Sequence, residues 1–181
     1  MDFRTMKMAS VEYLNDDSTG TVRGEETDKR GTFLPLSLRV NYSLCSFKNK
    51  VYIYGGISEQ SQVLATMEVF ECANYKFNPV KYRGDHTPLA RQGHSAHVLN
   101  QYSMLVLGGS YEQNLLTPPP LPENDMVWSY DLESGQWQRI QTKARSGGDH
   151  AVPWNLVHHV SLKLDEFNLC VLWQDDSVLG Q

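Results

Sequence analysis

The sequence is poor in the residues that mark secreted and membrane-spanning proteins. Only three of its 181 residues are cysteines, Cys45, Cys72 and Cys170, and they are odd in number and far apart. Cysteines of this kind are typical of reduced thiols, so we expect a cytoplasmic protein, with the nucleus as the alternative. No apolar segment follows the first methionine, and no window approaches 18 apolar residues. We therefore predict neither secretion nor a membrane span.

Positive charge is also scarce. The chain carries 16 Lys and Arg residues against 21 Asp and Glu residues, a formal net charge of −5. A nucleic-acid binder needs a basic stripe to meet the phosphates, so we expect no nucleic-acid partner. The sequence has no nucleophile elbow, no phosphate-binding glycine loop and no Cys-x-x-Cys pair. We therefore predict a protein that is not an enzyme and that binds no cofactor and no metal.

Short apolar runs bounded by turn residues are what the sequence does contain. Residues 104–107 form one such run, which ends at the diglycine Gly108-Gly109. Residues 126–131 and 137–140 form two more, separated by a turn at 133–135. Runs of this length, rich in β-branched and aromatic residues, are typical of strands in a meander. The Asp and Gly between the last two runs favour a tight hairpin.

The same markers occur earlier in the chain, in the same order. Residues 51–56 match the run that ends at Gly109, with an offset of 53 residues. Residues 69–71 match 129–131, and Phe77 matches Trp137, both with an offset of 60. The difference between these two offsets is about the size of a Pro-rich insert between Gly109 and Asp125. Arg39-Val40-Asn41-Tyr42-Ser43 also aligns with Arg91-Gln92-Gly93-His94-Ser95, so the sequence predicts a tandem repeat.

This repeat resembles the Kelch repeat of β-propellers, in which a diglycine follows a strand and spaced aromatic residues follow the diglycine. Residues 91–95 resemble the Arg-x-Gly-His segment that opens many Kelch blades. The resemblance implies an all-β fold, a partial Kelch-type β-propeller spanning 32–181, behind a flexible N-terminal tail at 1–31. It implies two four-stranded antiparallel blades, at 39–80 and 91–140, and an incomplete third at 145–181 that opens at Arg145–His150. The residues with an implied structural role are Gly55, Gly56, Phe77, Arg91, His94, Gly108, Gly109, Tyr130, Asp131 and Trp137.

Two questions about individual residues stay open at this stage. Arg91 and Arg145 are either buried arginines that bond strand-end carbonyls or exposed binding residues. The loop at 111–124 is long, Pro-rich and apolar at Leu115, Leu116 and Leu121. It either binds a partner as an extended, pre-ordered segment, or packs across its own blade or against a missing neighbour.

The function that the resemblance implies is protein–protein interaction, as a scaffold or a substrate-recruiting adaptor. Loops at the rim of a rigid scaffold are where recognition residues tend to lie. We therefore expect a protein partner to contact Tyr111 and the leucines of the 111–124 loop, together with Arg83 and His86 on the connection between the blades. A propeller usually has 4–8 blades. Two and a half blades indicate a fragment of a longer protein, a short form, or a chain completed by self-association or by another chain.

A metal-dependent oxidase is the alternative. Some Kelch-like propellers are metalloenzymes, and galactose oxidase binds copper with two tyrosines and two histidines. This chain has six histidines, at 86, 94, 97, 150, 158 and 159. The copper ligands do not map onto them residue by residue, so a remnant or subunit of such an enzyme stays the second hypothesis.

Overall fold

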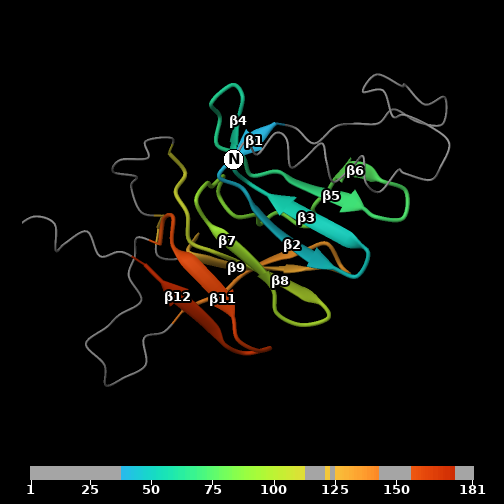
Figure 1. Ribbon diagram of the computed structural model, residues 1–181. Helices are drawn as coiled ribbons and strands as arrows, with labels where there is room; N and C mark the ends of the chain where they lie inside the picture. Colours follow the sequence, from blue (N-terminus) through green and yellow to red (C-terminus); the bar gives the residue numbers. More distant parts are fainter. Residues whose placement is uncertain (1–37, 113–120, 123–124, 143–155, 174–181) are drawn as a thin grey trace, which may run out of the picture. The chain divides into compact units, whose positions relative to one another are not determined.

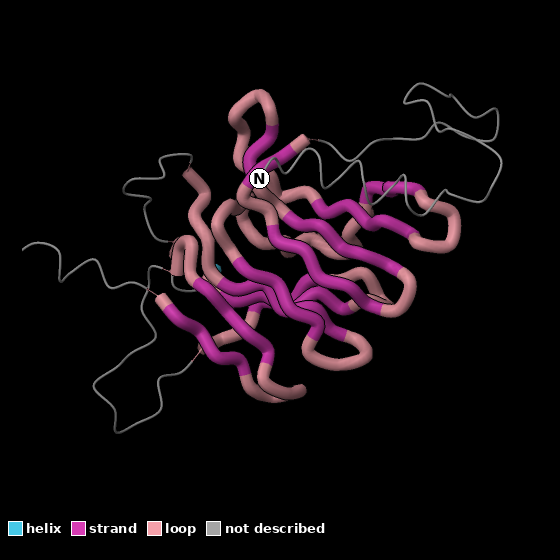
Figure 2. The backbone as a smooth tube through the Cα atoms, viewed as in Figure 1, coloured by secondary structure: helices cyan, strands magenta, loops and turns pink. Residues whose placement is uncertain are grey.

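The computed structural model describes residues 38–112, 121–122, 125–142 and 156–173. The chain divides into two units, Met1–Phe33 and Leu34–Gln181, and all described residues belong to the second. Within them the fold is all-β, without an α-helix (Figures 1 and 2). No helix in the described ranges is long and apolar enough to cross a membrane. The expected tail at 1–31 lies outside the described residues.

The strands in chain order are β1 (Arg39–Val40), β2 (Ser43–Phe47), β3 (Lys50–Tyr54), β4 (Ile57–Ser58), β5 (Met67–Glu71), β6 (Lys76–Pro79), β7 (Ser95–Val98), β8 (Ser103–Leu107), β9 (Val127–Asp131), β10 (Trp137–Arg139), β11 (Val160–Lys163) and β12 (Leu169–Leu172). Two four-stranded antiparallel sheets have the orders β2-β3-β5-β6, blade one, and β7-β8-β9-β10, blade two. The hairpin β11-β12 forms the third unit. The first strands of the three units, β2, β7 and β11, lie side by side in that order (Figure 1).

One small sheet was not expected from the sequence. Strand β1 pairs with β4, with Arg39 opposite Ser58 and Val40 opposite Ile57. Two-residue strands are too short to show an alternating pattern, so their pairing depends on the contacts of Arg39 rather than on periodicity.

Each sheet has two faces, because successive side chains of a strand point to opposite sides. We call the face that a sheet turns toward the next unit its forward face and the opposite face its backward face. One apolar cluster joins the forward face of blade one to the backward face of blade two. Blade one contributes Cys45, Phe47, Tyr52, Tyr54, Met67 and Val69, and blade two contributes Ala96, Val98, Met104, Val106, Trp128, Tyr130 and Trp137. Burying a large apolar side chain is worth about 1.5–3 kcal/mol, so this cluster is the main source of cohesion between the blades.

The contact between blade two and the third unit is smaller and more polar. Its apolar part is a cluster of Leu107, Leu121, Met126, Val127 and Leu156, with Leu105, Ile140 and Val171 packed against it. Its polar part includes side-chain hydrogen bonds from Ser95 to His159 at 2.8 Å and from His97 to Ser161 at 2.7 Å. The Lys163 ammonium also donates to the carbonyls of Val98 and Leu99, at 2.8 and 2.7 Å.

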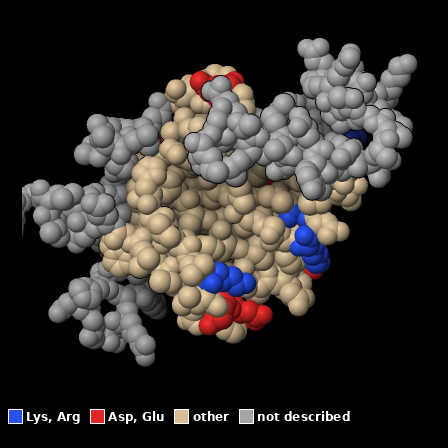
Figure 3. All heavy atoms as spheres, in the orientation of Figure 1, with Lys and Arg blue, Asp and Glu red and all other residues tan. Residues whose placement is uncertain are grey.

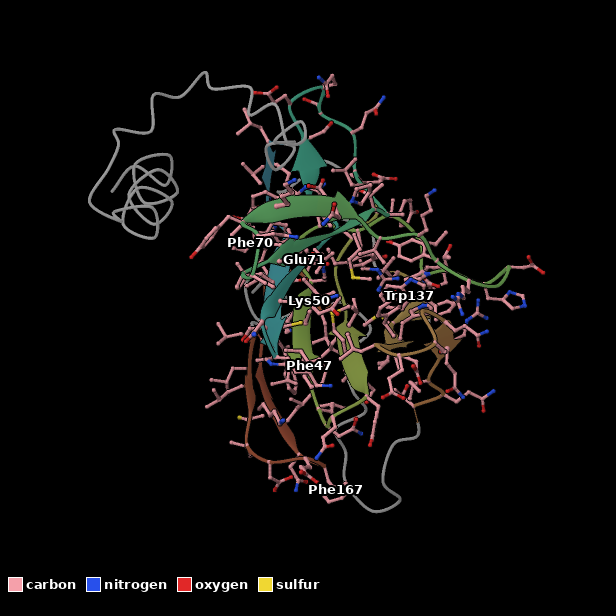
Figure 4. All side chains as sticks on the ribbon, turned by 90° about the vertical axis from the view of Figure 1, so that its right-hand side faces the viewer. Phe47, Lys50, Phe70, Glu71, Trp137 and Phe167 are labelled. Carbon is pink, nitrogen blue, oxygen red and sulfur yellow. The ribbon has the colours of Figure 1, made fainter. Side chains whose placement is uncertain are left out.

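Trp137 and Phe77 occupy the same position in their blades. Each lies on the fourth strand opposite an aromatic residue of the third, since Trp137 pairs with Tyr130 and Phe77 with Phe70. Trp137 is buried between the blades, whereas Phe77 is half-buried on the backward face of blade one, 4.8 Å from the Phe70 ring. Figure 4 shows Phe70 and Trp137 well apart on the ribbon. The two positions are therefore equivalent, but only blade two has a preceding blade to pack against among the described residues.

Candidate functional site

Arg91 is the most deeply buried charged residue of the described chain, with 0% of its surface exposed. Its guanidinium donates to the Gly108 carbonyl at 3.1 Å, and to the carbonyl and Oδ2 of Asp125 at 3.1 and 2.6 Å. Its Nε donates to the Leu89 carbonyl at 3.1 Å. Burial lowers the pKa of Arg91, and the nearby Tyr54 and Asp125 oppose that shift. These contacts bury the guanidinium among carbonyl and carboxylate groups of blade two and the segment before it.

Arg39 repeats this arrangement in blade one. It donates to the Gly55 carbonyl at 3.1 Å and to the Thr66 carbonyl at 3.4 Å, and it forms an ion pair with Glu68. In both blades the arginine that opens the sheet therefore holds the carbonyl of that sheet's own diglycine. Sequence reasoning missed the acidic partners, Glu68 and Asp125, because they stand at different distances from the diglycines.

His94 is buried beside this framework. Its Nε2 hydrogen-bonds the Ser43 hydroxyl of blade one at 2.7 Å, and its ring lies 5.3 Å from the Tyr54 ring, edge to face. Burial, followed by the positive charge of Arg91, lowers the pKa of His94 to about 3. A neutral imidazole in this place links two blades at physiological pH. Its role is structural, as the repeat implies.

The diglycines are where one unit receives the start of the next. A Cβ on Gly55 would lie 2.5 Å from the Arg91 carbonyl oxygen, and one on Gly108 would lie 2.3 Å from the Leu156 carbonyl oxygen. The second glycine of each pair donates its N–H to the same carbonyl, Gly56 to Arg91 at 2.9 Å and Gly109 to Leu156 at 2.7 Å. All four glycines have a positive φ, a backbone conformation that residues with a side chain adopt only with strain.

These contacts place the opening of the third unit at Leu156–His159. Leu156 meets Gly108-Gly109 as Arg91 meets Gly55-Gly56. Gly93 and His158, which lie two residues after Arg91 and Leu156, both have a positive φ. The backbone N–H of His158 donates to the Gly93 carbonyl at 2.9 Å. The opening predicted from the sequence, Arg145–His150, lies outside the described residues. Leu156, a leucine, stands where the first two units have arginine.

A comparison with family models decides the identity of this framework. Residues 21–162 match the model described as the KLHDC2/KLHL20/DRC7 Kelch-repeats domain. This chain belongs to the Kelch-repeat family. The matched range begins inside the segment expected to be a tail. No curated protein matches the chain. The all-β fold and its sheets are those of a partial Kelch propeller.

The remaining repeat residues of this Kelch domain also serve the fold. Tyr130 is buried in the cluster between the blades. The Asp131 carboxylate accepts the N–H groups of Glu133 and Ser134 at 2.9 and 2.7 Å, which fixes the turn between β9 and β10. These two hydrogen bonds lower the pKa of Asp131.

The residues predicted to bind partners separate into three groups. Arg83 and His86 are exposed on the segment that connects the Kelch blades, and Tyr111 is 43% exposed. Leu121 is only 2% exposed and packs in the cluster with Leu107 and Leu156, so this position of the loop is buried between blade two and the third unit. Leu115 and Leu116 lie outside the described residues. No described hydrogen bond or ring contact joins Tyr111 to the connecting segment.

Four described histidines, at 94, 97, 158 and 159, take part in contacts between the sheets, whereas His86 is exposed on the connecting segment. His97 and His159 each bond a serine of the neighbouring unit. No group of three or more His, Cys, Asp or Glu side chains within the described ranges is placed to hold a metal ion.

Proposed function

We propose that this Kelch domain is a cytoplasmic scaffold or substrate-recruiting adaptor that binds a protein partner and catalyses no reaction. Kelch-repeat domains are in general protein-interaction modules. Two of the polar residues that repeat from blade to blade, Arg91 and His94, are buried in the framework. Recognition therefore falls to residues that do not repeat.

The observation that carries the proposal is the segment between the blades, residues 83–89. It is anchored near both ends to blade two, since the Arg83 N–H donates to the Gly135 carbonyl at 2.8 Å and the Leu89 N–H to Asp125 Oδ2 at 3.2 Å. Between these anchors residues 84–87 are exposed, and His86 is among them. A displayed segment on a fixed base loses little conformational freedom when a partner docks. Tyr111 adds a second exposed aromatic contact.

The test is quantitative capture of partners by the full chain. Proteins captured by the wild type are identified by mass spectrometry and counted again with Arg83→Ala, His86→Ala and Tyr111→Ser. Glu166→Ala is the control, because Glu166 is exposed on the turn between β11 and β12, in the third unit. We expect at least one partner to fall several-fold with the first three variants and not with the control. Equal recovery of every partner with all four variants would overturn the assignment of this surface.

A further inference from the structure

The forward face of the third unit is apolar and exposed. Val160, Leu162 and Leu172 are 65%, 62% and 64% exposed. Val160 pairs with Leu172 and Leu162 with Cys170, so the four side chains share one face of the β11-β12 hairpin. The opposite face, with Ser161 and Lys163, turns to blade two. The forward face carries no charged side chain among the described residues of the two strands.

The equivalent face of blade one is covered by the next blade. Ser43, Cys45, Tyr52 and Tyr54 occupy the same register positions in blade one as Val160, Leu162, Cys170 and Leu172 in the third unit. Tyr52 and Tyr54 are 8% and 1% exposed because blade two packs against them. A patch of large exposed apolar residues marks an interaction surface.

A second apolar surface, only partly exposed, lies at the other end of the described repeats. The backward face of blade one carries Leu44, Val51, Phe70 and Phe77, which are neighbours across the sheet. Leu44 is 56% exposed, and the other three are half-buried. Their equivalents in blade two, Ala96, Met104, Tyr130 and Trp137, are all buried against blade one. Few charged side chains appear on the face of the described part drawn in Figure 3.

We propose that a second copy of this chain packs the backward face of its blade one against the forward face of the third unit. The same forward-to-backward stacking already occurs twice within the chain, between blades one and two and between blade two and the third unit. The two free faces are the remaining halves of the same kind of contact. Both are apolar, and neither requires an unpaired charge to be buried.

Two copies satisfy both faces when they pack reciprocally about a two-fold axis. Each copy supplies three units, blade one, blade two and the β11-β12 hairpin, so the closed ring has six, within the 4–8 blades that propellers have. A ring that closes leaves no free face for further copies, whereas a head-to-tail contact that fails to close produces filaments.

Trp173 sets the strength of this contact. Trp173 occupies the position after Leu172 that Gly55 occupies after Tyr54 and Gly108 after Leu107. At those two glycines a carbonyl oxygen of the next unit lies 2.5 and 2.3 Å from where a Cβ would be. The opening segment of a second copy cannot approach Trp173 as closely. The contact is therefore carried by the strand faces alone, and we expect a reversible dimer with a dissociation constant in the micromolar range, the weak end for interfaces of standard size.

Sedimentation velocity on the full chain, from about 1 to 100 µM, tests the proposal. Wild type is expected to shift from monomer to dimer across this range. Leu162→Glu, on the forward face, and Leu44→Glu, on the backward face, are each expected to stay monomeric. Tyr102→Glu is the control, because Tyr102 is 52% exposed on the turn between β7 and β8 and lies on neither face, and it should dimerise like wild type.

The decisive sample is an equimolar mixture of Leu162→Glu and Leu44→Glu. Each variant keeps the face that the other has lost, so the mixture should form a dimer through one of the two contacts, at least tenfold weaker than wild type. Its formation also shows that both variants are folded. Leu162→Ser and Leu44→Ser replace them if the glutamates impair folding. A monomeric wild type at 100 µM, a Leu44→Glu protein that still dimerises alone, or species that grow beyond the dimer would overturn the proposal. None of these residues belongs to the partner-binding surface, so either hypothesis can fail without the other.

Discussion

The Trp137 ring of blade two lies against the Tyr54 ring of blade one, with 5.2 Å between their centroids and 50° between their planes. Trp137 also contacts the rings of Tyr130 and Tyr82, at 4.9 and 5.8 Å. One indole thus joins a residue of its own sheet, a residue of the neighbouring sheet and a residue of the segment that connects them. Tilted and edge-to-face pairs of this kind add about 0.5–1.5 kcal/mol each beyond the area they bury.

Replacing Trp137 by Ala should lower the free energy of unfolding by about 3–5 kcal/mol, since it removes a buried aromatic side chain and leaves a cavity between the blades. Phe77→Ala is the matched comparison at the equivalent position of blade one, where the ring is half-buried. We expect its effect to be less than half as large. Urea unfolding followed by fluorescence and circular dichroism measures both. Equal losses would mean that Trp137 does not hold the blades together.

Gly55→Ala should be far more damaging than Gly84→Ala. Both glycines have a positive φ, so both substitutions carry the strain of that conformation, about 1–2 kcal/mol. Only at Gly55 would the new Cβ also meet the Arg91 carbonyl oxygen, at 2.5 Å, whereas nothing lies within 4 Å of it at Gly84. We expect the clash to cost a further 1–3 kcal/mol or so. Urea midpoints for the two variants, compared with wild type, give the difference directly.

The blades could be predicted from the sequence because diglycines, spaced aromatic residues and alternating strands all recur with short, regular offsets. The opening of the third unit at Leu156 could not be predicted in this way. Asn41, Gly93 and His158 share a positive φ although their side chains have nothing in common, and Leu156 takes the place of an arginine. Their equivalence appears only in the backbone hydrogen bonds to the preceding unit. Sequence alone also left open the packing of Leu121, because an apolar loop residue looks the same whether it meets its own blade or a partner.

Arg91→Met should reduce the free energy of unfolding by about 3–5 kcal/mol, because it leaves the buried Asp125 carboxylate without its cation. Asp125→Asn in the same chain should recover part of this loss, since the amide is uncharged and its oxygen can still accept the Trp128 Nε1–H, now 2.9 Å from Asp125 Oδ1. A double-mutant cycle in urea measures the coupling. Additive effects of the two substitutions would show that the ion pair contributes nothing of its own.

Lowering the pH should destabilise the domain already at pH values well above those at which carboxylates titrate. Burial lowers the pKa of His94 to about 3, and it also lowers the pKa values of His97 and His159. An unfolded histidine has a pKa of about 6.5, so below that pH the unfolded chain binds protons that the folded chain does not. Stability contributed by the neutral histidines is therefore full above pH 6.5 and decreases as the pH falls. For His94 alone the loss between pH 7.5 and pH 5 is about 2 kcal/mol.

The pH dependence can be assigned to His94 with one substitution and one control. His94→Gln keeps a polar group within reach of the Ser43 hydroxyl but takes up no proton, so the difference in unfolding free energy between pH 7.5 and pH 5 should shrink by about 2 kcal/mol. His86→Gln, on the exposed connecting segment, should leave that difference unchanged. Urea midpoints at the two pH values are sufficient for the comparison. A His94→Gln protein that loses as much stability in acid as wild type would show that other groups account for the effect.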